Sequence, residues 1–192
     1  MLKLTSKQNC CGCTACASIC PKGCIAMTPD SEGFCYPQID EANCINCGLC
    51  EKVCPLLHKP AQHEVLNVYG AKNSDDSVRF TSSSGGMFTL FAEWVLNSGG
   101  TIFGAELDEN LQVHHTAIEN TGALPKLRGS KYVQSNMVGI FKQVRTLLNS
   151  GKPVLFSGTP CQIAGLKGFL TKDYANLFTV DVVCHGVPSA KV

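Results

Sequence analysis

Long hydrophobic runs, an export signal and an excess of charge of one sign are all lacking in this sequence of 192 residues. No run of eighteen or more apolar residues occurs, so we expect no membrane-spanning helix. The start, MLKLTSKQNC, has no apolar segment of the kind that marks a secretory signal. The formal net charge is +1, from 16 basic and 15 acidic residues, and this balance argues against nucleic-acid binding. We therefore expect a cytoplasmic protein in which the 13 cysteines are reduced thiols or metal ligands rather than disulfides.

The sequence does contain a cysteine motif that occurs twice within 45 residues, in the form C-x2-C-x2-C-x3-C-P. This spacing is the bacterial arrangement for [4Fe–4S] clusters, in which three thiolates on a tight loop surround one corner of the cubane. The fourth cysteine of each copy ligates the other cluster in two-cluster ferredoxins. The predicted ligands of the first cluster are Cys10, Cys13, Cys16 and Cys54, and those of the second cluster are Cys44, Cys47, Cys50 and Cys20.

Zinc sites and disulfide bonds are the alternatives for these cysteines. Zinc ligands usually occur as two pairs separated by a dozen or more residues and often include histidine, whereas no histidine lies among the motif cysteines. Cys11, Cys24 and Cys35 do not fit the ligand pattern, and we expect them to be packed or spare thiols. The spacing thus favours two iron–sulfur clusters and predicts that the chain transfers electrons.

The motifs divide the chain into three parts. Residues 1–57 form an internal duplication, which predicts a small ferredoxin-like unit with strands at 25–27 and 36–39 joined by a turn. Residues 58–67 are polar, and we expect them to be a linker. Residues 68–192 alternate between strand and helix patterns, which predicts an α/β layer. In this last part we expect strands at 68–71, 101–105, 113–118, 154–156 and 178–183, and helices at 87–96, 136–148 and 162–170.

Two segments of the last part have the composition of an anion-binding site. Residues 81–86, TSSSGG, come directly before a helix pattern, where small residues let backbone N–H groups approach a phosphate. An N-cap with a flexible loop is the alternative there. Residues 127–135, LRGSKYVQS, combine two cations with a tyrosine and hydroxyl groups, so they either grip an anionic cofactor or form a solvated loop. We expect His114 and His115 to have surface or packing roles.

Two cysteines follow buried strand patterns in the same part. Cys161, in FSGTPCQ, stands at the start of a helix pattern, where we expect the helix N-terminus to lower the pKa of its thiol. Cys184, in VVCHGVP, follows the next strand. Ligands of open α/β sheets bind at the carboxyl ends of the strands, so the two thiols are placed to face one cleft. A redox pair, ligands of a further cluster and buried structural thiols are the three interpretations.

Together, FSGTPCQIAGL, DVVCHGVPS, SSSGGMF and RGSKYVQS behind a tandem ferredoxin motif resemble the beta-subunit family of coenzyme F-420 hydrogenases and dehydrogenases. The resemblance covers essentially the whole chain. It implies FAD beside the iron–sulfur clusters, a redox partner protein or other enzyme subunit, and a soluble electron acceptor, which is the deazaflavin coenzyme F-420 in methanogen enzymes. Members usually continue well beyond the CHGVPS motif, so we expect the flavin-binding α/β domain to be incomplete in this chain.

Carried over to this chain, the resemblance implies flavin contacts and a catalytic pair. The implied flavin-binding residues are Ser82, Ser83, Ser84, Gly85, Gly86, Arg128, Ser130, Lys131 and Thr159. Cys161 and Cys184 would stand near the flavin as catalytic residues, or as ligands of an additional [4Fe–4S] cluster. The prediction is therefore an α+β iron–sulfur flavoprotein subunit of an oxidoreductase. Its rivals are a non-catalytic ferredoxin-type electron carrier and a truncated remnant of a longer enzyme.

Overall fold

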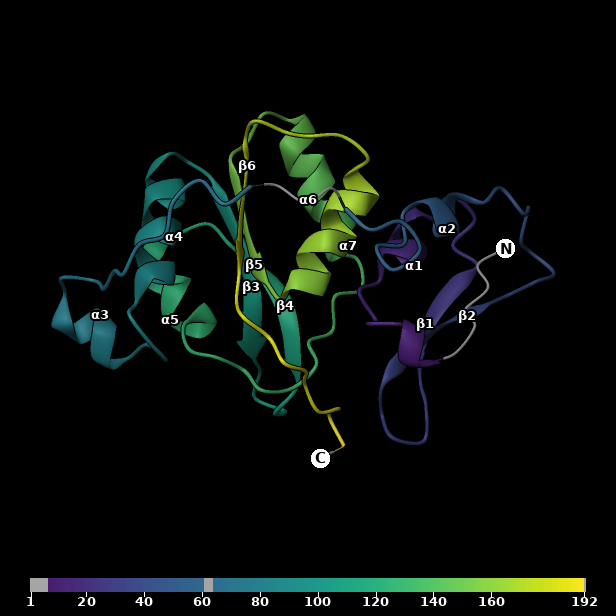
Figure 1. The fold of residues 1–192 in the computed structure, drawn as a ribbon, viewed down its shortest axis with the longest axis horizontal. Coiled ribbons are helices and arrows are strands. Elements are labelled where there is room, and N and C mark those ends of the chain that lie inside the picture. The colour runs from purple at the N-terminus through teal and green to yellow at the C-terminus, as the bar shows by residue number, and fades with distance from the viewer. Residues whose placement is uncertain (1–6, 61–63, 192) are drawn as a thin grey trace.

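The computed structural model describes residues 7–60 and 64–191, and it has an α+β fold in which two units lie side by side (Figure 1). The smaller, N-terminal unit contains a two-stranded antiparallel sheet of β1 (Ile25–Pro29) and β2 (Cys35–Ile39). Three short helices accompany this hairpin. They are η1 (Lys7–Asn9), α1 (Ala15–Ile19) and α2 (Leu49–Lys52).

The larger unit is a four-stranded sheet between two layers of helices. Its strands are β3 (Thr101–Leu107), β4 (Val113–Ile118), β5 (Val154–Gly158) and β6 (Leu177–Asp181), in the order β4-β3-β5-β6. Strands β3, β5 and β6 run parallel, while β4 returns antiparallel beside β3. The helices are α3 (Asp76–Phe80), α4 (Met87–Asn97), η2 (Thr121–Ala123), α5 (Leu124–Leu127), α6 (Ile140–Asn149) and α7 (Pro160–Leu170). Helices α4 and α5 lie on one side of the sheet, and α6 and α7 lie on the other (Figure 1).

Each face of the sheet is buried in its own hydrophobic cluster. On the side of α4, Ala92 packs in one cluster with Leu155 of β5. On the opposite side, Phe156 of β5 packs with Phe141 of α6 and Phe169 of α7. Successive residues of a strand point to opposite faces, so β5 supplies both clusters in turn. Burial on both faces explains why this strand is a continuous apolar run in the sequence.

The N-terminal unit shares the second of these clusters. Ala15 of α1 and Val53, which follows α2, are buried there beside α6 and α7. Two glycines of α7 permit this close approach. A Cβ on Gly165 would lie 2.8 Å from the Cβ and Sγ atoms of Cys13, and one on Gly168 would lie 2.5 Å from the carbonyl oxygen of Val53. The two units therefore meet along one face of α7, where a larger residue has no room.

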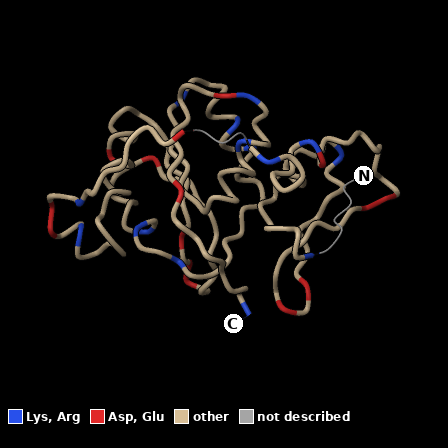
Figure 2. Tube along the Cα trace, in the orientation of Figure 1, with Lys and Arg blue, Asp and Glu red and all other residues tan. Residues whose placement is uncertain are grey.

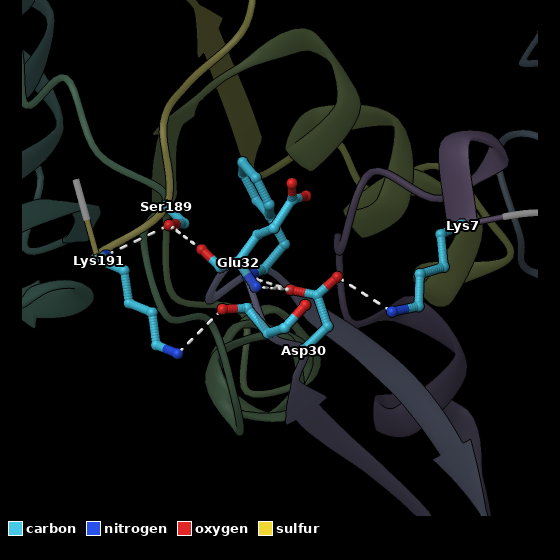
Figure 3. A network of polar contacts seen from close by, with 7 residues as sticks. Lys7, Asp30, Glu32, Ser189 and Lys191 are labelled. Carbon is cyan, nitrogen blue, oxygen red and sulfur yellow. Dashed lines mark hydrogen bonds and ion pairs between the residues drawn. The ribbon is translucent and has the colours of Figure 1, made fainter.

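The C-terminal tail forms a second contact between the units (Figure 3). Ser189 is fully buried, and its hydroxyl donates to the backbone carbonyl of Glu32 in the β1–β2 turn. The ammonium group of Lys191 donates to the preceding carbonyl of the same turn at 3.1 Å. Lys7 forms an ion pair with Asp30, at the start of the turn, at 3.0 Å. Segments from both ends of the described chain thus hold this turn in place.

Most of the expected elements are confirmed to within a few residues, but two expectations are wrong. Residues 68–71, expected as a strand, form no regular element, and their two large side chains are exposed, so no neighbouring strand or core fixes them. The helix expected from residue 136 begins only at Ile140, because Asn136 bridges to β4 and Gly139 adopts a left-handed φ of 82°. Residues 61–63 of the expected linker lie outside the described residues.

Charged residues of both signs are spread along both units rather than gathered in one region (Figure 2). This distribution agrees with the net charge of only +1. Among the helices that the structure describes, none is long and apolar enough to cross a membrane.

Candidate functional site

Two cavities open in the N-terminal unit, and each is lined by four of the motif cysteines. Those at the first cavity are Cys10, Cys13, Cys16 and Cys54, and those at the second are Cys44, Cys47, Cys50 and Cys20. In each cavity three cysteines come from one copy of the motif and the fourth comes from the other copy, which is the crossed arrangement of two-cluster ferredoxins. Within the described ranges, no three side chains converge closely enough to hold a single metal ion.

The loops that carry the first three cysteines have the same backbone conformation in both copies. Left-handed φ angles occur at Gly12 (65°) and Thr14 (65°) in the first copy, and at Asn46 (52°) and Gly48 (73°) in the second. Both pairs stand two and four residues after the first cysteine of their motif. Residues with positive φ turn a chain sharply, so thiols two residues apart are directed toward one centre. The internal duplication therefore extends from the sequence to the backbone.

The buried hydroxyl of Thr14 gives independent evidence about what the first cavity binds. It is only 5% exposed, and its Oγ1 atom is a buried oxygen without a hydrogen-bond partner in the part of the chain that the structure describes. Leaving a buried hydroxyl unpaired costs about 1–3 kcal/mol. Thr14 lines the first cavity beside Cys13, where the sulfur atoms of a bound cluster would accept a hydrogen bond from its hydroxyl. The residues present therefore fit a [4Fe–4S] cluster.

Two of the motif thiols at the first cavity have raised pKa values. Burial raises the pKa of Cys16 to about 12, and burial also raises the pKa of Cys10. Repulsion from the neighbouring Cys54 acts in the same direction on both groups. Metal ligands are thiolates, so loading of a cluster must release these protons. The positive charge of iron supplies the stabilisation that the empty protein lacks.

Two further cysteines, expected above to be packed or spare, also line these cavities. Cys24 lies at the second cavity, with its Sγ atom 3.4 Å from that of Cys20. Cys11 lies at the first cavity, and interaction with the thiol of Cys13 raises the pKa of Cys11 to about 12. The one feature of the sequence that could have predicted this position is that both cysteines lie close along the chain to cysteines of the motif.

The two segments predicted to bind a flavin meet beside the N-terminal end of α4. The hydroxyl of Ser83 accepts a hydrogen bond from the backbone N–H of Ser130 at 2.7 Å. The guanidinium of Arg128 donates from Nη1 to Thr81 Oγ1 at 2.9 Å and from Nε to Thr89 Oγ1 at 3.2 Å. Arg128 is thus held by two hydroxyl groups and keeps further donors for an anion.

The glycines of the first segment have a packing role that requires no ligand. A Cβ on Gly85 would lie 2.8 Å from the carbonyl oxygen of Ala71, and Gly86 adopts a left-handed φ of 73°. The carbonyls of both glycines accept hydrogen bonds from Asn73. Ser82 caps the end of α3, because its hydroxyl donates to a backbone carbonyl of that helix at 2.6 Å. These contacts fix the loop that precedes α4.

Lys131 folds back onto its own loop. Its ammonium group donates to the backbone carbonyls of Lys126 (3.0 Å) and Arg128 (2.9 Å), and burial lowers its pKa. An ammonium group has three donors, so one remains for a ligand. Ser84 lies on the facing loop and is exposed. The two loops therefore present two cations and the exposed hydroxyl group of Ser84 to one region of the surface.

The N-termini of α4 and α7 both lie at the carboxyl edge of the parallel strands. Helix α7 starts directly after β5, and Thr159 and Gln162 form a capping box at its first turn, with a hydrogen bond of 2.9 Å from Thr159 N to Gln162 Oε1. Helix α4 ends shortly before β3 begins. Its C-terminus therefore lies near the start of β3, and its N-terminus lies near the carboxyl end of that strand. Helix N-termini attract anions, and this edge is where α/β sheets bind ligands.

His115 links this edge to the second predicted segment. Its Nε2 atom lies 3.0 Å from the carbonyl oxygen of Ser157, and its Nδ1 atom lies 2.7 Å from Ser135 Oγ. The carbonyl only accepts, so Nε2 carries the proton and the hydroxyl of Ser135 donates to Nδ1. Burial lowers the pKa of His115 to about 4, which keeps the ring neutral. The packing role expected for this histidine is confirmed.

The two candidate catalytic cysteines have different surroundings. Cys161 lies in the first turn of α7, with Sγ 3.1 Å from Thr159 Oγ1. The expectation that the helix N-terminus lowers its pKa is wrong, because the hydrogen bond with Cys11 and burial raise the pKa of Cys161. Cys184 follows β6 and is exposed.

Comparisons with known proteins agree with this geometry. Residues 9–56 match the family model of the 4Fe-4S dicluster domain. No curated protein is similar enough in sequence to count as a relative of this chain. Among solved structures, the fold is similar to that of a chain from the xenon-derivatised F420-reducing [NiFe] hydrogenase complex of Methanosarcina barkeri, with a TM-score of 0.51 and 21% sequence identity.

The structural similarity extends beyond the dicluster segment, because it covers 62% of this chain. It covers 44% of the hydrogenase chain, so this chain spans less than half of that chain's length. This similarity agrees with the resemblance drawn from the sequence motifs. The protein therefore carries iron–sulfur clusters in an N-terminal 4Fe-4S dicluster domain, joined to an α/β unit within a fold similar to that of a hydrogenase-complex chain.

Proposed function

We propose that this chain is an iron–sulfur flavoprotein subunit of an oxidoreductase, which passes electrons between two [4Fe–4S] clusters, FAD and a soluble acceptor. The observation that carries the proposal is the crossed lining of the two cavities by the motif cysteines. In the proposal, each cavity binds one cluster through its four motif cysteines. A [4Fe–4S] cluster supplies one-electron transfer at a potential that its protein surroundings set.

The facing loops before α4 and after α5 are proposed to bind the flavin. Arg128 and Lys131 would bind its pyrophosphate, and the hydroxyl groups of Ser83, Ser84 and Thr159 would orient it at the edge of the sheet. A flavin supplies the exchange between one-electron and two-electron chemistry. The buried His115 keeps the second loop against β5, so the binding residues are positioned before a ligand arrives.

The first cavity lies close to this edge of the sheet. Cys13 lines the first cavity and lies against Gly165 of α7, and this helix starts where β5 ends. Electrons thus have a short route from the first cluster to the proposed flavin. The acceptor is proposed to be the deazaflavin coenzyme F-420 or another soluble two-electron carrier. Because the similar solved chain is part of a complex, we also propose a redox partner protein or a further enzyme subunit.

The proposal is tested with protein purified without oxygen. We expect a broad absorption shoulder near ~400 nm that bleaches with dithionite, and about eight iron atoms per chain. Added FAD should bind, seen as quenching of its fluorescence, with bands separate from the shoulder. Clusters without flavin binding would reduce the proposal to an electron carrier. A protein that stays colourless after reconstitution with iron and sulfide would contradict it entirely.

A further inference from the structure

The two cluster loops differ at one position that their shared backbone conformation makes equivalent. Thr14 stands four residues after the first cysteine of the first motif, and Gly48 stands four residues after that of the second. Both residues have a left-handed φ, of 65° and 73°, and both come directly before a short helix. A positive φ is uncommon for a β-branched residue and unstrained for glycine. The first loop therefore carries a threonine where the backbone favours glycine.

The local structure does not use the hydroxyl group of Thr14. A threonine before a helix usually accepts a hydrogen bond from a backbone N–H of the first turn, but the side chain of Thr14 forms no such cap to α1. Its buried Oγ1 atom has no hydrogen-bond partner among the described residues. Crowding does not explain the glycine of the second loop, because a Cβ on Gly48 would meet no described atom within 4 Å. The hydroxyl of Thr14 is thus an unpaired donor at the wall of the first cavity.

We propose that the hydroxyl of Thr14 donates a hydrogen bond to a sulfur atom of the first cluster and thereby raises the reduction potential of that cluster. The inference rests on the proposed function, because it requires a [4Fe–4S] cluster in the first cavity. Reduction adds one electron and no proton, so the negative charge of the cluster grows by one while the proton of the hydroxyl stays on Thr14. A donor directed at the sulfur atoms stabilises this added charge, and such hydrogen bonds are among the factors that set cluster potentials.

The different burial of the two loops explains why the first cluster needs such a donor. Cys16 of the first cavity is buried, whereas Cys47 of the second cavity is exposed to solvent, which supplies hydrogen bonds of its own. Burial disfavours an added charge unless a hydrogen-bond partner compensates for it. The first cavity is also the one beside the α/β unit, since Cys13 lies against Gly165 of α7. By stabilising the reduced state there, Thr14 favours electrons on the cluster that lies beside the α/β unit.

The test measures the cluster potentials of protein that is purified and kept without oxygen. Redox titration, followed by the electron paramagnetic resonance of the reduced clusters, should give two one-electron steps in wild type. Thr14→Val keeps the shape and the β-branch of the side chain but removes the donor. It should lower the midpoint of one step and leave the other unchanged. The equilibrium constant for reduction should fall about tenfold, which is about 59 mV for a one-electron couple. Thr14→Ser keeps a hydroxyl group and should stay close to wild type.

A matched control and a second variant keep the test decisive. Thr171→Val is the same change at another threonine with a left-handed φ (61°), which lines neither cavity, and it should leave both steps as in wild type. Thr14→Ala lacks the β-branch as well as the hydroxyl, so it should lower the same step even if valine disturbs the loop.

Three outcomes would contradict the inference. Unchanged midpoints in Thr14→Ala with both clusters bound would overturn the role of Thr14 and leave the proposed function standing. Loss of a cluster from both Thr14→Val and Thr14→Ala would also overturn this role, because the hydroxyl would then hold the cluster rather than set its potential. Wild type that stays without clusters after reconstitution would overturn the proposed function as well.

Discussion

Gly165 of α7 lies directly against Cys13 of the N-terminal unit, so a Cβ built at position 165 falls 2.8 Å from both the Cβ and the Sγ of that cysteine. Cys13 is a predicted ligand of the first cluster. A helix of the α/β unit therefore forms a wall behind the cluster loop. Any side chain larger than that of glycine at position 165 would displace the loop or the helix, so we expect formation of the first cluster to depend on the packing of α7.

Gly165→Ala should disturb the first cluster. Alanine is the better helix former by about 1 kcal/mol, but the overlap with Cys13 costs about 1–3 kcal/mol and displaces the loop. We expect the iron content to fall toward half, since the second cavity lies away from α7. Iron analysis and visible absorption measure the change. Lys167→Ala, an exposed change on the same helix, should keep the full iron content, and equal iron content in both variants would contradict the coupling.

His115 should make the α/β unit less stable in acid. Burial lowers the pKa of its ring from 6.5 to about 4 in the folded state. Below pH 6.5 the unfolded chain binds a proton that the folded chain does not, so stability falls as the pH drops from 6.5 to about 4 and then levels off. Between pH 7 and pH 5 we expect the free energy of unfolding to fall by about 2 kcal/mol from this group.

Denaturant unfolding at the two pH values, followed by the fluorescence of the single tryptophan, Trp94, measures this loss. His115→Gln removes the titrating ring and should reduce the difference between the two pH values. His58→Gln, a change at an exposed histidine, should leave the difference as in wild type. The same pH dependence in all three proteins would show that His115 is not its source.

The parts of the fold that could be predicted from the sequence are those that a short sequence pattern specifies. The continuous apolar run of β5 indicates a strand buried on both faces, and the motif spacing alone predicts which cysteines share a cavity. The apolar residues at 68–71 look like a strand by composition, but composition says nothing about whether a partner strand is present. The packing of the ferredoxin-like unit against α7 depends on the small size of Gly165 and Gly168. This packing could not be predicted from the sequence, because the two surfaces that meet there are not known from it.

Within the candidate site, the long-range contacts were the least predictable. The helix N-terminus favours a thiolate at Cys161, yet the neighbouring Cys11 reverses the effect, and that neighbour comes from the other end of the chain. The link from His115 to Ser135 and Ser157 is likewise set by three separate segments. By contrast, the loop sequences around Ser83 and Arg128 suggested one common role, and the structure places these two loops in contact.

Cys24 should substitute for Cys20 at the second cluster. Both thiols line the same cavity with their sulfur atoms 3.4 Å apart, so a small shift of the cluster brings one in place of the other. Cys20→Ala should therefore keep most of the iron of wild type, with a changed electron paramagnetic resonance signal from the reduced cluster. The double variant Cys20→Ala/Cys24→Ala should lose the second cluster. If Cys20→Ala alone lost it, Cys24 would be a packing residue only.

Arg128 should determine the affinity for the flavin without affecting the clusters. Its guanidinium is held by Thr81 and Thr89 in a fixed orientation beside α4, and hydrogen bonds to a charged group contribute about 1.5–3 kcal/mol. Arg128→Leu should therefore weaken FAD binding roughly 10- to 100-fold, while the absorption near ~400 nm stays unchanged. Arg128→Lys keeps the charge but loses the planar fork of donors, so its affinity should be intermediate. Anaerobic titration with FAD, followed by flavin fluorescence, compares these variants with Lys142→Ala, an exposed change on α6. Equal affinities for Arg128→Leu and Lys142→Ala would place the flavin away from this loop.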